Sequence, residues 1–118
     1  MGEYRASSAP RRILNEERER ILKDPGFGDN FTDYMAHQRW TEAEGWSEGE
    51  ILPYGPLSLE PAAAVFHYAQ EIFEGLKAFR HADESVWTFR PEKNAARIQN
   101  SARRLALPEI STEDFLAS

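Results

Sequence analysis

The stretch from His67 to Arg80, HYAQEIFEGLKAFR, gathers side chains that could do chemistry. Glu71 and Glu74 could form an acid–base pair, which requires two carboxylates close together in one cleft. Residues three apart on a strand point to opposite faces, so we interpret both as surface or hydrogen-bonded glutamates. Lys77 could act as a nucleophile if its surroundings excluded water. We favour the alternative, in which its stem packs on a strand edge and its ammonium stays in water.

Other kinds of site have less support in the sequence. The histidines, His37, His67 and His81, lack metal-ligand spacing and no cysteine accompanies them, so we predict no metal site. The glycine patterns of nucleophile elbows and nucleotide loops are absent. Arg97 has a guanidinium that suits a phosphate, although an arginine on the polar face of a helix is usually solvated. Pattern alone leaves its role open.

Two predicted strands and a helix would position these side chains. Alternation over residues 72–80 and the β-rich run 85–90 predict strands, and HADE between them predicts a hairpin turn. Residues 91–107 open with proline and predict the most regular helix of the chain. Its apolar stripe consists of Ala95, Ile98, Ala102 and Leu105.

The other segments predict shorter elements. We expect a flexible tail over residues 1–10, a helix over 11–24, a strand over 31–35 and a loop over 41–60 that is broken by ILPY. A helix should begin near Pro61, and Ser111 or Thr112 should cap a last one. The prediction is an α+β fold with a short antiparallel sheet and flanking helices.

Composition limits the classes of protein. At 118 residues the chain has room for one small domain. Its net charge of −6 argues against binding to nucleic acid or to an anionic membrane, and its apolar runs are too short to cross a bilayer. With no cysteine and no apolar leader, the chain is expected to be cytoplasmic.

Three ordered motifs then point to a family. They are FGDNFTDYM at residues 27–35, PYGPLSLEPAAAVFHYAQEIFEGLKAFR at 53–80 and FRPEKNAARIQNSARRLALP at 89–108. Together they resemble the N-terminal part of branched-chain amino acid aminotransferases, fold-type IV enzymes that use pyridoxal 5′-phosphate (PLP). One departure is Tyr34, where many members have histidine.

The resemblance implies an activity and a site. Family members transfer the amino group of leucine, isoleucine or valine to 2-oxoglutarate, and PLP supplies the electron sink. The family arginine that matches Arg97 holds the PLP phosphate. The aromatic residues that match Phe27, Tyr68 and Phe73 line the pocket for the substrate side chain, where rigid apolar walls exclude water.

The resemblance also implies what this chain lacks. The family lysine that carries PLP lies further downstream, and none of Lys23, Lys77 and Lys93 matches it. We therefore expect no catalytic residue here, no activity of the chain alone, and PLP binding that is weak at best, without a specific saturable site. Residues 11–118 would be part of the small N-terminal domain. Family members are homodimers, so a homo-oligomer is expected.

Two alternatives remain. One is a free-standing, non-catalytic binding or interaction protein derived from the family; we expected it to end in a closed element, which DFLAS is not. The other is a different fold-type IV enzyme, a D-amino acid transaminase or an aminodeoxychorismate lyase. The motifs PYGPLSL and HYAQEIFEGLKAFR favour the branched-chain family.

Overall fold

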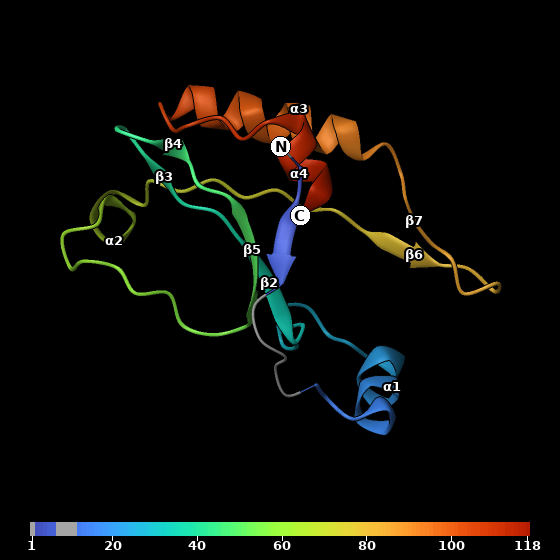
Figure 1. The fold of residues 1–118 in the computed structure, drawn as a ribbon. Coiled ribbons are helices and arrows are strands. Elements are labelled where there is room, and N and C mark those ends of the chain that lie inside the picture. The colour runs from blue at the N-terminus through green and yellow to red at the C-terminus, as the bar shows by residue number, and fades with distance from the viewer. Residues whose placement is uncertain (1, 7–11) are drawn as a thin grey trace.

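The computed structural model describes residues 2–6 and 12–118, which form helices around three small sheets (Figure 1). The predicted α+β class is confirmed. The helices are α1 (Asn15–Lys23), α2 (Ala64–Tyr68), α3 (Pro91–Arg104) and α4 (Thr112–Ala117). The strands are β1 (Tyr4–Ala6), β2 (Tyr34–His37), β3 (Trp40–Thr41), β4 (Gly45–Trp46), β5 (Gly49–Pro53), β6 (Ala78–Arg80) and β7 (Val86–Thr88).

The largest sheet has the strand order β1-β5-β2, in which β1 runs parallel and β2 antiparallel to β5. The predicted flexible tail is therefore wrong for residues 4–6; the rest of the tail, apart from residues 2 and 3, lies outside the described residues. The reason is a tertiary contact. Gly49 leaves room for the ring of Tyr4, whose hydroxyl donates a 2.8 Å hydrogen bond to Gln38 Oε1.

The predicted loop over residues 41–60 also contains strands. Trp40 pairs with Trp46 across β3 and β4, and Gly45 has a φ of +73°, a value that glycine adopts without strain. The first three residues of the ILPY run belong to β5, where Ile51 pairs with Ala36 of β2, and Tyr54 follows the strand. β2 itself begins three residues later than predicted.

The hairpin of β6 and β7 is confirmed, with Phe79 opposite Trp87. Residues 72–77, predicted as part of its first strand, form no regular strand. Side-chain contacts to α3 hold this segment instead, through the carboxylate of Glu74.

The helices agree with the sequence best at α3. Its residues Ala95 and Ala102 are 0% and 2% exposed and are the buried apolar residues of the described chain. Leu105, predicted on the same buried stripe, is exposed. Ser111 caps α4 by accepting a 2.9 Å hydrogen bond from the Asp114 amide. No helix in the described ranges is long and apolar enough to cross a membrane.

Candidate functional site

A cleft of about 580 Å³ runs along one face of α3. Its polar walls come from consecutive turns of the helix, and its apolar walls come from the helix end and the segment before β6. We call it the α3 cleft. Its lining residues are Ile72, Phe73, Arg97, Asn100, Ser101, Arg104 and Leu105.

At one side of the α3 cleft, Arg97 forms a two-point ion pair with Glu74. The Nε–H of Arg97 donates to Glu74 Oε2 over 2.8 Å, and Nη2 donates to Oε1. Asn94 Nδ2 donates to Glu74 Oε1 and to the carbonyl of Gly75, both over 2.8 Å. The Glu74 side chain is 4% exposed, whereas that of Arg97 is 67% exposed. The carboxylate is therefore buried and the arginine faces outward.

The electrostatics keep both partners charged. The hydrogen bond from Arg97 is the largest cause that lowers the pKa of Glu74 to about 2; burial opposes it, and Asn94 assists it. The same hydrogen bond raises the pKa of Arg97. At neutral pH the pair is a buried anion held by a partly exposed cation.

The donors that Arg97 retains decide what it can bind. A guanidinium has five N–H groups, and Glu74 engages two of them, on the Nε–Nη2 edge. Among the described residues none accepts from the edge formed by Nη1 and Nη2, and this fork matches two oxygens of a phosphate or carboxylate. The donor set of Arg97, with the Asn100 amide in the same cleft, fits a phosphate ester, whereas the Ser101 hydroxyl already donates a 3.1 Å hydrogen bond to the Arg97 carbonyl.

The structure brings together two of the four predicted site residues. Phe73 is 86% exposed and lines the α3 cleft with Arg97. Tyr68 ends α2 and is 84% exposed, and Phe27 is 97% exposed; neither lines the cleft. α1, which precedes Phe27, lies at the opposite end of the molecule from α3 (Figure 1). The assignment of all three aromatic residues to a substrate pocket stays a prediction.

Three polar residues that line the α3 cleft were not predicted as site residues from the sequence. Asn100, Ser101 and Arg104 follow Arg97 by three, four and seven residues, a spacing that places all four on one helix face. That periodicity was visible in the sequence and could have identified them. The contact between Arg97 and Glu74 had no such signal, since it joins a helix to a segment without regular structure.

The other candidate groups are not gathered into sites. Lys77 and Glu71 are exposed. Among the described residues no group of three or more histidine, aspartate or glutamate side chains could hold a metal ion. Glu74 is a hydrogen-bonded glutamate, as we predicted.

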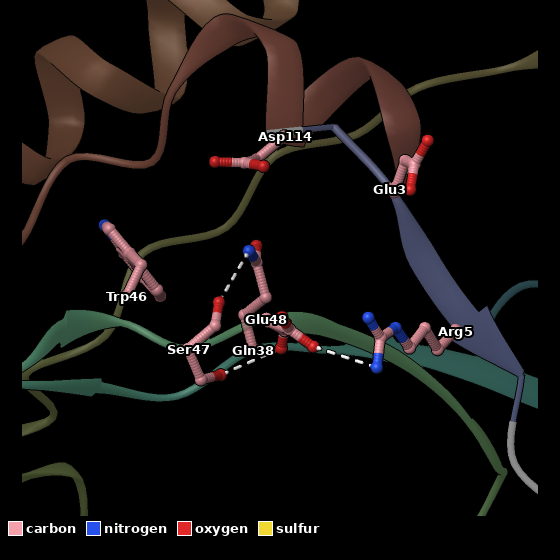
Figure 2. A pocket seen from close by; sticks show the side chains of 7 residues that line it. All are labelled: Glu3, Arg5, Gln38, Trp46, Ser47, Glu48 and Asp114. Atoms are coloured by element: carbon pink, nitrogen blue, oxygen red, sulfur yellow. Dashed lines mark hydrogen bonds and ion pairs between the residues drawn. The ribbon is translucent and has the colours of Figure 1, made fainter.

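A second, polar cleft of about 360 Å³ lies between β1, the β4–β5 turn and α4, and Figure 2 shows its side chains. Arg5 lies 3.6 Å from the carboxylate of Glu48, and Gln38 donates to the Ser47 carbonyl over 3.3 Å. These polar groups therefore bind one another. They join β1 and the segment after β2 to the turn between β4 and β5.

The structure is thus an α+β unit in which Arg97, paired with Glu74, shares the α3 cleft with the exposed ring of Phe73. Comparison with known proteins is more specific. No protein-family model matches the chain. The chain matches the N-terminal region of branched-chain-amino-acid aminotransferases at 51–55% identity, which confirms the resemblance predicted from its motifs.

Three relatives illustrate this similarity. A probable branched-chain-amino-acid aminotransferase of Streptomyces coelicolor is 55% identical over 114 residues, 97% of this chain and 31% of that protein. The branched-chain-amino-acid aminotransferase of Mycolicibacterium smegmatis is 52% identical over 98% of this chain and 32% of that protein. The mitochondrial enzyme of Saccharomyces cerevisiae is 46% identical over 86% of this chain and 26% of that protein. The chain spans about a third of the length of the first two relatives.

Proposed function

We propose that this chain forms the N-terminal part of a branched-chain amino acid aminotransferase, which transfers the amino group of leucine, isoleucine or valine to 2-oxoglutarate. The similarity to named aminotransferases supports the family. The observation that carries the site is the pairing of Arg97 with Glu74, which leaves the Nη1–Nη2 edge of Arg97 without a partner among the described residues; Arg97 and Phe73 both line the α3 cleft. Residues 11–118 would then be part of the small domain, in a cytoplasmic enzyme.

PLP is the proposed cofactor of the whole enzyme, and when bound it supplies an electron sink for removal of the substrate α-proton. Arg97 would hold its phosphate through the Nη1–Nη2 edge. The Asn100 amide, one turn further along the same helix face, could donate a further hydrogen bond to a phosphate oxygen. This chain's part in the reaction is to bind and orient.

The proposed substrate wall is aromatic. Phe73 on the α3 cleft, with Tyr68 and Phe27, would offer rigid apolar surface to a branched side chain. All three rings are largely exposed, so they exclude water only when more protein covers them. That protein would come from the rest of the enzyme or from a second copy, in line with the homodimer implied by the resemblance.

The reactive amine is proposed to come from outside these 118 residues. Lys23, Lys77 and Lys93 match no cofactor-lysine motif, and Lys77 is exposed rather than enclosed in a site. The chain alone is therefore expected not to transfer amino groups.

A chimera tests this function. The matching segment of the M. smegmatis enzyme is replaced by this chain, and leucine-dependent glutamate formation is measured against the parent enzyme. The chimera should be active. Arg97→Ala would leave the buried Glu74 unpaired, so it is combined with Glu74→Gln. This double variant should need at least about tenfold more PLP for half-maximal activity, because a charged hydrogen-bond donor is lost. A folded but inactive chimera, or an unchanged PLP requirement, would contradict the proposal.

A further inference from the structure

The geometry points to Glu74 as a positioning residue that holds the Arg97 guanidinium in the orientation needed for a phosphate. This inference rests on the function proposed above and adds a role for a residue to which the resemblance assigned none. The carboxylate engages Nε and Nη2, which fixes the plane of the guanidinium. The opposite fork has no partner among the described residues, and Arg97 itself lines the α3 cleft.

Glu74 can do this because it is itself fixed. Its side chain is 4% exposed, and Asn94 binds its Oε1 with one amide hydrogen and the Gly75 carbonyl with the other. Asn94 and Arg97 are three residues apart on α3, so both reach the carboxylate from one helix face. The buried Glu74 carboxylate therefore accepts hydrogen bonds from two side chains of one turn of α3. This gives the Arg97 guanidinium a rigid support.

Two effects of Glu74 on phosphate binding oppose each other. Without its partner, the long Arg97 side chain would sample many rotamers and lose that freedom on binding. With its partner, the carboxylate charge repels the phosphate. Arg97 is largely exposed but the Glu74 carboxylate is buried, so salt screens the repulsion in part, whereas the hydrogen-bond geometry persists. Measurements at low salt are therefore compared with measurements at about 0.5 M salt, where the Debye length is a few ångströms and the repulsion is reduced relative to the positioning effect.

The test follows Arg97 itself by ¹⁵N NMR of the full 118-residue chain. Pyridoxine 5′-phosphate and pyridoxine serve as probes, because they differ only in the phosphate and have no aldehyde to react with lysines. In the wild type, the phosphate ester should shift the Arg97 Nε signal at millimolar concentration, and pyridoxine should not. In Glu74→Gln, the Nε–H should exchange faster, and the affinity for the phosphate ester should fall about three- to tenfold at high salt.

Glu109→Gln is the matched control. Glu109 pairs with Arg103, which is on α3 like Arg97, and neither Glu109 nor Arg103 lines the α3 cleft. It should leave both readouts unchanged. If Glu74→Gln binds the phosphate ester as tightly as the wild type or more tightly, Glu74 is only a competing counter-ion and the inference is overturned. If the phosphate ester leaves the Arg97 Nε signal of the wild type unchanged, the proposed role of Arg97 in phosphate binding is wrong, and the inference about Glu74 is wrong with it.

Discussion

At the scale of single residues, the pairing of Glu74 with Arg97 explains most of what the candidate site can do. The side chain of Glu74 is 4% exposed, and burying its charge without a partner would be costly in free energy. Hydrogen bonds from Arg97 and Asn94 together offset that cost. The arginine in turn keeps a free edge for an anion. The same contact therefore stabilises the fold and prepares the site.

This pairing makes stability depend on pH in a defined direction. The folded pKa of Glu74 is about 2, below its ordinary value of 4.5. A depressed pKa contributes stability that is fully present above the unfolded value and is lost as pH falls through the folded one. The difference in free energy of unfolding between the wild type and Glu74→Gln should therefore be largest above pH 5 and shrink steadily toward pH 2. Urea unfolding at several pH values measures it.

Glu71→Gln is the control for that series, because Glu71 is an exposed glutamate only three residues away. It should change the free energy of unfolding little at any pH. A difference for Glu74→Gln that stays constant from pH 7 to pH 2, or grows on acidification, would refute the ion pair as described.

At the scale of secondary-structure elements, the contact between β1 and β5 depends on a single glycine. A Cβ at Gly49 would lie 2.6 Å from Cδ1 of Tyr4, a separation that the rigid ring cannot tolerate without moving. Gly49→Ala should displace β1, break the hydrogen bond to Gln38 and lower the free energy of unfolding by about 1–3 kcal/mol. Chemical denaturation followed by tryptophan fluorescence checks this.

Gly55→Ala is the matched control for that substitution. Its added Cβ would meet only the Pro53 carbonyl oxygen, at 3.9 Å, so the change should stay within about 0.5 kcal/mol. If Gly49→Ala lowers the free energy of unfolding as little as Gly55→Ala does, the contact between β1 and β5 contributes nothing measurable to stability.

The same elements show how far sequence reasoning reached. α3 and the β6–β7 hairpin follow from local patterns: a proline start with apolar spacing, and β-rich runs around a turn. β1 was missed because a segment of three residues is too short to show an alternating pattern and forms a strand only when β5 offers an edge. The substrate assignments of Phe27 and Tyr68 came from resemblance, and no local pattern of the chain would have indicated them.

At the scale of the whole molecule, the chain exposes far more surface than a compact protein of its mass. Its accessible surface is 10204 Å², whereas a folded monomer of 13.5 kDa exposes about 6,500 Å². Its radius of gyration is 16.2 Å against about 13.5 Å for a compact domain. Much of the excess is apolar, including a groove lined by Trp40, Trp46, Ile72, Ile98, Leu107 and Ile110.

We therefore predict self-association of the purified chain at micromolar concentration, driven by burial of this apolar groove. Trp40→Arg should weaken it by inserting a charge into the groove. Phe66→Arg, at an exposed aromatic residue outside the groove, should have a smaller effect. Sedimentation velocity measures both. A wild type that stays monomeric at about 100 µM would contradict the prediction.

We propose that this chain contributes a phosphate contact and an aromatic wall to the enzyme, while the reactive amine lies outside these residues. The most direct test is an absorbance titration of the purified chain with PLP, beside Lys77→Ala and the double variant Arg97→Ala/Glu74→Gln. We predict no lysine–PLP band that saturates at one equivalent. A stoichiometric band that disappears in Lys77→Ala would contradict the account and make Lys77 the catalytic residue.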